Sequence, residues 1–161
     1  MRIVVNSSPL IAFAILGQLD LLPLIFSEIY IPQAVFNEVS VWGKPYSQQL
    51  RAFSANRVKV VQNEIAVEVL TNEVDLGEAE AIVLALENRI VDILIDDPKG
   101  RKVAQANGLY PIGTIGVLLQ AKKSGHVSEV KPSLDELIAH KIRLGKQLYH
   151  KALELAGETK Q

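Results

Sequence analysis

The chain has 161 residues, of which 48% are hydrophobic and 22% are charged, and its net charge is −1. These values are typical of one globular domain with a full-sized core, and the absence of cysteine excludes disulfides and thiolate chemistry. No basic segment followed by an apolar one precedes the first strand, and the longest apolar runs are too short to cross a bilayer. We therefore expect a cytoplasmic protein with no membrane partner.

The charges are unevenly distributed along the chain. Residues 1–97 hold 6 Lys and Arg against 13 Asp and Glu, a net charge of −7, whereas residues 98–161 have a net charge of +6. This pattern fits a metal cluster beside a phosphate-binding surface, and it equally fits chance sorting of solvated surface charge.

Short apolar segments alternate with helical segments along the chain. The pattern predicts strands at residues 2–6, 29–31, 58–61, 93–95 and 110–112. It predicts helices at residues 9–16, 20–26, 33–39, 48–54, 77–88, 98–107, 115–123, 134–140 and 148–155. This alternation favours an α/β three-layer sandwich with a central parallel β-sheet and helices on both faces. We expect a single domain over residues 1–161, whose C-terminal helices at about 132–156 pack on the core or form a partner surface.

Two predicted strands end in similar sequences, IVVNSSP and ILIDDP. Ser8 and Asp97 each stand directly before a proline, which predicts that they are N-caps with proline at the first helical position. Asn6 and Asp96 then end their strands at the carboxyl edge of the sheet. This edge is where open α/β proteins bind ligands.

Two more acids are predicted to come close to this edge. Glu38 ends one predicted helix, and Glu78 begins another, 18 positions before Asp96. A helix of about three turns and a returning strand bring Glu78 and Asp96 to the same edge. Clustered carboxylates cannot all stay ionised without a cation, and oxygen ligands suit Mg²⁺ or Mn²⁺. Such an ion can activate water and stabilise phosphoryl charge, which predicts phosphodiester hydrolysis.

The order and spacing of four segments resemble a known family. They are VVNSSPLIAFAILGQLDLL, IYIPQAVFNEV, LGEAEAIVLALE and ILIDDPKGRKVA. Together they resemble PIN-domain proteins of the VapC-like type, and more closely a little-characterised prokaryotic PIN-like family that begins VVN-x-SPLI. The resemblance covers residues 1–125 well and the C-terminal helices less specifically.

The resemblance implies a Mg²⁺- or Mn²⁺-dependent endoribonuclease. Many such proteins are toxins of toxin–antitoxin pairs and form homodimers, so RNA, an antitoxin protein and a second copy of the chain are the implied partners. The family's four acids fall on Asn6, Glu38, Glu78 and Asp96, which are the implied catalytic residues. Asn6, Glu78 and Asp96 are the implied metal ligands, with Asp97 as an alternative to its neighbour.

The departure from the family pattern is Asn6, where PIN nucleases have Asp. An amide oxygen can ligate a metal but contributes no charge, so we expect a nuclease that is weak or has lost activity. The alternative function is a catalytically inactive PIN-like module that binds nucleic acid or protein. Asn6 also has a purely structural interpretation as a turn former.

The serine or threonine that often follows the first acid of the family is matched by Ser7 or Ser8. Lys99, Arg101 and Lys102 follow the acidic pair and could hold an RNA backbone, or could simply be solvated. The two implied metal ligands Glu78 and Asp97 also have purely structural interpretations. Glu78 fits a capping box with Asp75, and Asp97 fits a helix cap better than it fits a metal ligand.

Dinucleotide binding and phosphate-receiver functions are disfavoured. No G-x-G-x-x-G follows the first strand, as a dinucleotide fold would require. A receiver domain would have its acidic pair at the first strand, where this chain has Asn6 and Ser7.

Overall fold

The computed structural model describes residues 1–159, and its centre is a single parallel sheet. The strands lie in the order β3-β2-β1-β4-β5, and every neighbouring pair is parallel. The strands are β1 (Arg2–Val5), β2 (Glu28–Pro32), β3 (Val58–Lys59), β4 (Asp92–Leu94) and β5 (Tyr110–Ile112).

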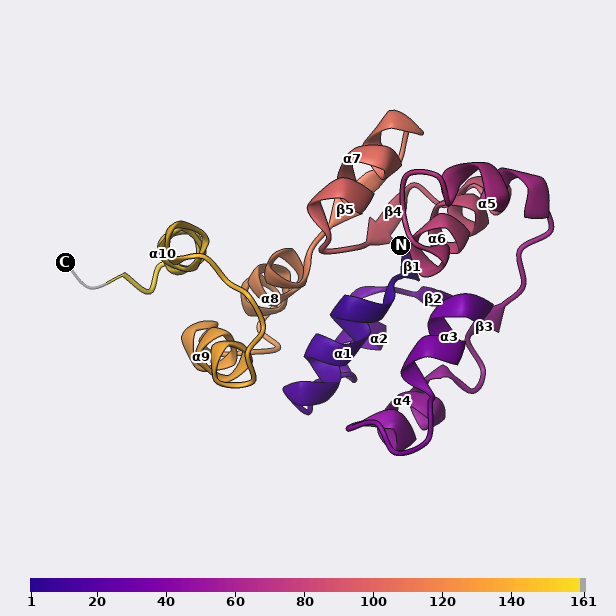
Figure 1. Ribbon diagram of the computed structural model, residues 1–161. Helices are drawn as coiled ribbons and strands as arrows, with labels where there is room; N and C mark the ends of the chain where they lie inside the picture. The colour runs from indigo at the N-terminus through magenta and orange to yellow at the C-terminus, as the bar shows by residue number, and fades with distance from the viewer. Residues whose placement is uncertain (160–161) are drawn as a thin grey trace.

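Helices cover both faces of this sheet (Figure 1). They are α1 (Ser7–Ile15), α2 (Leu21–Ile25), α3 (Gln33–Val39), α4 (Ser47–Ser54), α5 (Glu64–Leu70), α6 (Leu76–Glu87), α7 (Pro98–Ala106), α8 (Thr114–Lys123), α9 (Lys131–Ala139) and α10 (Lys146–Leu155). The predicted three-layer α/β sandwich is therefore confirmed. Within residues 1–159, no helix combines the length and apolar character that crossing a bilayer requires.

Alternation along β1 divides the interior into two cores. Ile3 and Val5 belong to the cluster under α1, α2 and α8, while Val4 belongs to the cluster under α5, α6 and α7. All three side chains are fully buried. A strand that is buried on both faces needs an unbroken apolar run, which explains the sequence IVV.

The chain reverses its direction of sheet growth between β1 and β4. β2 and β3 extend the sheet on one side of β1, and β4 and β5 extend it on the other. In open α/β folds, a crevice for ligands forms at such a switch point, outside the carboxyl ends of the strands. The backbone N–H of Asn6 donates to the carbonyl oxygen of Leu94 at 2.9 Å, so the segments that follow β1 and β4 lie side by side at this crevice.

The structure corrects some local predictions. Helix α1 begins at Ser7 with Asn6 as its N-cap, so the prediction that Ser8 is the N-cap is wrong. Helix α5, in a segment where the sequence predicted no element, packs against α6. The strands before the two polar ends stop one to two residues earlier than predicted, at Val5 and Leu94.

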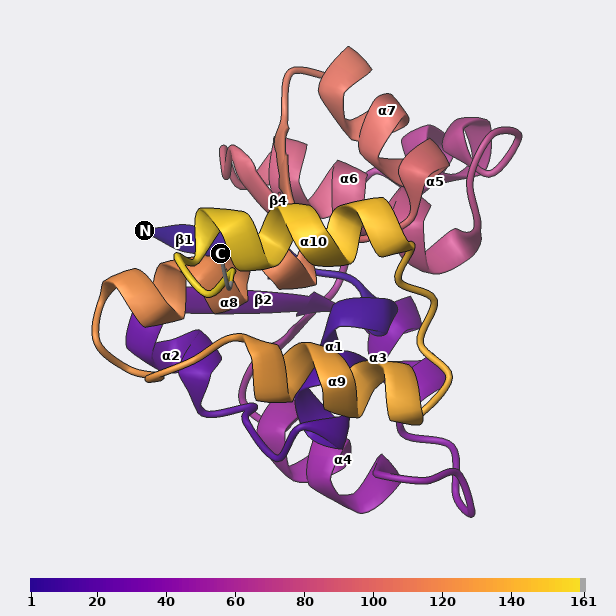
Figure 2. The ribbon, with the colours of Figure 1, turned by 90° about the vertical axis from the view of Figure 1, so that its left-hand side faces the viewer.

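Helices α9 and α10 form an outer layer against α8 (Figures 1 and 2). Leu134 and Leu153 bury their side chains in the larger core. The carboxylate of Glu158 accepts a hydrogen bond from the backbone N–H of Val130 at 2.8 Å and pairs with the ammonium of Lys122 at 2.8 Å. These contacts attach the two helices to the rest of the fold.

Candidate active site

Asn6 lies at the switch point with a buried side chain that has no hydrogen-bond partner among residues 1–159. It is the N-cap of α1 and is 5% exposed, yet its side chain makes no capping bond. An N-cap side chain normally accepts from the second or third helical N–H, and here the third residue is Pro9, which has none. The carboxamide of Asn6 is therefore available to a ligand.

Ser7 connects the end of β1 to α3. Its hydroxyl donates to Oε2 of Glu38 at 2.5 Å. The other end of α3 is fixed by α6, because Oε1 of Glu80 accepts a hydrogen bond from the backbone N–H of Ala34 at 2.9 Å. The structure thus brings Glu38 next to the residue that follows Asn6.

Glu78 occupies the first turn of α6 and makes the capping box that the sequence predicted. Asp75 Oδ1 accepts from the Glu78 N–H at 2.8 Å, and Glu78 Oε1 accepts from the Asp75 N–H at 3.2 Å. The other oxygen, Oε2, is buried and has no partner. Burial, together with the charges of Asp75 and Asp97, raises the pKa of Glu78 to about 7, although the hydrogen bond from the Asp75 backbone lowers it.

Glycines let three segments approach one another around Glu78. A Cβ on Gly100, in the first turn of α7, would collide with Oε2 of Glu78 and lie 2.6 Å from Cδ1 of Ile95. A Cβ on Gly77 would lie 3.5 Å from Oδ1 of Asn6. The starts of α6 and α7 therefore meet at Glu78, and the start of α6 also meets Asn6. Neither glycine was predicted as a site residue, and the only sign of them in the sequence is that each lies in the first turn of a predicted helix.

Asp96 is held by the start of α8. Its Oδ1 accepts from the Thr114 N–H at 2.7 Å, and its Oδ2 accepts from the Thr114 hydroxyl at 2.5 Å. Each carboxylate oxygen keeps a second lone pair, so these bonds orient the group without excluding a further ligand. Thr114 is the first residue of α8 after the N-cap Gly113, so these two bonds join the start of α8 to Asp96.

Asp97 and the neighbouring cations have separate places on α7. Asp97 is the N-cap of α7, and its Oδ2 accepts from the Gly100 N–H at 2.9 Å. The Arg101 guanidinium donates to the carbonyl oxygen of Ile95 at 3.0 Å, whereas Lys99 and Lys102 are exposed. Asp96, Arg101 and Lys102 line an open groove of about 660 Å³ between α7, β5 and α8. The cations of α7 therefore border a groove that contains Asp96.

A family model described as a PIN domain matches residues 2–158. The chain belongs to the PIN-domain family. No curated protein and no solved structure matches it significantly. PIN domains are generally nucleases, typically depend on divalent metals and often pair with antitoxins. The predicted family is thus confirmed, and it implies a nuclease in the broad sense.

The oxygen donors of this PIN domain suit a hard cation that takes few ligands from the protein. Among residues 1–159, no three His, Cys, Asp or Glu side chains gather closely enough to hold a metal by themselves. The unpartnered Oε2 of Glu78 and the unpartnered amide of Asn6 are the donors a cation would find at the switch point. Mg²⁺ commonly uses one or two carboxylates plus waters and substrate phosphates, so the donor set fits such an ion.

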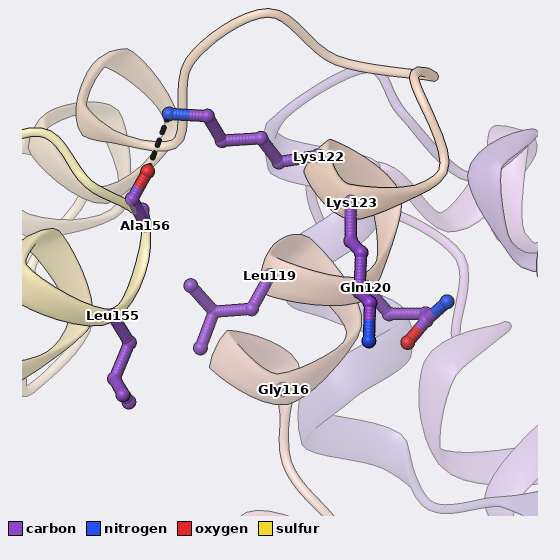
Figure 3. Close-up of a pocket in the computed structure, with 7 residues that line it drawn as sticks. All are labelled: Gly116, Leu119, Gln120, Lys122, Lys123, Leu155 and Ala156. Atoms are coloured by element: carbon purple, nitrogen blue, oxygen red, sulfur yellow. Dashed lines mark hydrogen bonds between the residues drawn. The ribbon is translucent and has the colours of Figure 1, made fainter.

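A further cavity of the PIN domain lies away from these acids (Figure 3). It has a volume of about 450 Å³ between α8 and α10 and contains none of the predicted site residues. Lys122, on its rim, is already engaged, since its ammonium donates to the carbonyl oxygen of Ala156 at 2.6 Å. We therefore locate the candidate active site at the sheet edge and not in this cavity.

Proposed function

We propose that this PIN domain is a Mg²⁺- or Mn²⁺-dependent endoribonuclease whose activity is weakened by Asn6. The observation that carries the proposal is the buried, unpartnered Oε2 of Glu78 at the switch point of a PIN fold. A buried polar atom without a partner costs stability, and an ion that completes the site is one explanation for such an atom.

Each predicted site residue has a role in this proposal. Asn6, Glu78 and Asp96 hold the ion, with Asp97 as the alternative ligand, and the ion when bound activates water and stabilises phosphoryl charge. Thr114 orients the carboxylate of Asp96 through two hydrogen bonds. Glu38 is oriented by the hydrogen bond from Ser7, and Ser7 is the proposed contact for RNA beside the ion.

The charge balance explains why the activity is expected to be weak. Asn6 contributes no charge, and burial raises the pKa of Glu78 to about 7, so near neutral pH only part of the population has that carboxylate ionised. A cation must displace the remaining protons. Metal binding should therefore strengthen as the pH rises through 7.

The test combines calorimetric binding of Mn²⁺ with cleavage of a single-stranded RNA by wild type, Asn6→Asp and Asp96→Asn. We expect wild type to bind weakly and cut slowly, Asn6→Asp to bind and cut at least about tenfold better, and Asp96→Asn to do neither. If none of the three binds metal, the proposed metal site is wrong.

A second candidate function is a PIN-like module that binds RNA or a protein without cutting. The observation in its favour is Asn6 itself, since the site lacks one acid of the family pattern. It predicts that only Asn6→Asp binds metal and cuts. The roles of toxin, antitoxin partner and homodimer are parts of the first proposal, and induced expression with growth measurement and light scattering would test them.

A further inference from the structure

A cavity of about 450 Å³ opens beside Glu38, and Asp96 is not among the residues that line it. Aliphatic side chains of α1, α3 and α4 line it, and the rings of Tyr46 and His140 complete its walls. Lys44 and Glu38 are the charged residues in its lining. This size and a mostly apolar lining with a few polar groups are typical of sites for small organic groups.

We propose that this cavity binds the base of one unpaired nucleotide of a single-stranded RNA, an inference that rests on the proposed ribonuclease function. A base is flat and largely apolar, and it stacks on aromatic rings irrespective of its sequence. A paired base is enclosed in its duplex and cannot enter, so the site selects single strands.

The cavity is joined to the candidate active site by one hydrogen bond. Glu38 lines the cavity, and its Oε2 accepts the bond from Ser7, the residue next to Asn6. The negative charge of Glu38 favours a neutral base over a phosphate inside the cavity. The phosphate attached to that base is then left outside, toward the sheet edge where Asn6 and Glu78 lie.

A segment between α9 and α10, residues 140–145, leads from this cavity to the first turn of α10. We call it the α9–α10 strap. His140, at its start, lines the cavity, and Leu148, in the first turn of α10 that follows it, lines the groove that contains Asp96. Figure 2 shows the strap at the side of the molecule toward which the β2 arrow points, which is the carboxyl edge of the sheet.

The strap presents cations along this path. Ile142 and Leu144 are half-buried, while Lys141 and Arg143 are exposed, so exposed cations alternate with half-buried apolar residues along the strap. Within residues 1–159, neither Lys141 nor Arg143 makes an ion pair. Unpaired cations beside a base-sized cavity suit a nucleic acid, whose phosphates contact the cations while a base fills the cavity. An acidic peptide without a flat ring would contact the cations but would not fill the cavity as well.

The test is fluorescence anisotropy of a labelled single-stranded RNA of about ten nucleotides, a size within the range such surfaces bind. EDTA is present, so binding is measured without metal or cleavage. The variants are His140→Ala, Tyr46→Gly and the double variant Lys141→Gln/Arg143→Gln. Glycine suits position 46 because Tyr46 has a φ of 67°. The controls are His126→Ala and Lys123→Gln/Lys151→Gln, which make the same chemical changes away from the cavity.

We expect each ring variant to weaken binding about fivefold to tenfold, and to affect an abasic strand of the same length much less. The strap double variant should bind about tenfold more weakly and reduce the slope of log affinity against log salt by about 1.4. Control variants should bind like wild type. The inference would be overturned if all variants bound the RNA equally, or if the ring variants lost as much affinity for the abasic strand. It would also be overturned if an acidic peptide displaced the labelled RNA and unlabelled RNA did not.

Cleavage in Mn²⁺ separates this inference from the proposed function. If wild type and the cavity variants cut and bind RNA equally well, the nuclease proposal stands and the base site is wrong. If wild type binds RNA as described but does not cut, the base site stands and the nuclease proposal is wrong. If wild type neither binds nor cuts, both are wrong.

Discussion

The ends of β1 and β4 have similar sequences but use their polar residues differently. At the end of β4, proline is the first residue of α7, so Gly100 keeps its N–H and donates it to the N-cap Asp97. At the end of β1, proline is the third residue of α1 and has no N–H to donate, and the N-cap Asn6 makes no capping bond. The position of the proline thus removes one of the two usual donors to the N-cap side chain at β1 but not at β4.

The β4 end also carries two acids, whereas the β1 end carries none. Asp97 caps α7, while Asp96 holds the start of α8 through Thr114. The end of β4 therefore anchors two helices, and the end of β1 leaves its amide unpartnered. Substitutions at the β4 end should therefore affect stability more than substitutions at the β1 end.

The largest stability effect is expected for Asp96→Ala. This change leaves the N–H and hydroxyl of Thr114 without their charged acceptor, and should lower the free energy of unfolding by about 3 kcal/mol. Urea denaturation followed by circular dichroism measures the loss. Thr114→Val, which removes only the hydroxyl, should lose about half as much, and a loss under about 0.5 kcal/mol for Asp96→Ala would contradict the anchoring role.

Gly100→Ala should come next. The added methyl would collide with Glu78 and Ile95, and should lower the free energy of unfolding by about 2 kcal/mol. Gly116→Ala is the matched control, because a Cβ there meets Ile112 at 3.4 Å, an ordinary contact. In the first turn of α8 the control should raise stability by about 0.5 kcal/mol or less, so equal effects of the two changes would refute the close approach.

The pH dependence of stability should depend on Glu78. Its folded-state pKa of about 7 lies above the ordinary value of 4.5, so between these values the folded state binds more protons than the unfolded state. The free energy of unfolding should therefore fall as the pH rises from 4.5 to 7, by about 1–2 kcal/mol from this group. Urea denaturation in EDTA at pH 5 and pH 8 measures the fall, which should be missing in Glu78→Gln. An unchanged fall in that variant would assign the effect to another group.

The smallest expected effect separates the two predicted caps. Asp97→Ala should lower the free energy of unfolding by about 1 kcal/mol, because it removes the acceptor of the Gly100 N–H. Ser8 is exposed and caps nothing, so Ser8→Ala should change stability by less than about 0.5 kcal/mol. The two variants are compared by thermal denaturation, and similar losses would restore Ser8 as a cap.

Most of the fold could be predicted from local patterns. Unbroken apolar runs identified the buried parallel strands, and the spacing from Asp75 to Glu78 identified the start of α6. Helix α5 was missed because Ile65 and Val69 are exposed while Val67 is buried, a pattern that hides the amphipathic period of a short helix. The N-cap of α1 was misplaced because proline was expected at the first helical position and lies at the third.

The candidate site could be predicted only in part, because its contacts join distant segments. The positions of the acids at the ends of strands and helices could be predicted from the topology alone. The bond from Ser7 to Glu38, the contact of Gly100 with Glu78 and the support of Asp96 by Thr114 depend on how separate helices pack. No periodicity or spacing in the sequence encodes such contacts.

The sheet order has a consequence for biosynthesis. β1 is the central strand, and one of its two neighbours, β4, begins at Asp92. At about 5–20 residues per second, the ribosome needs roughly 4–18 s to make the intervening chain. During that time Ile3, Val4 and Val5 belong to a strand with an unpaired edge, although all three are fully buried in the finished protein. The nascent chain is thus exposed to strand-edge association and is a natural substrate for chaperones until β4 emerges.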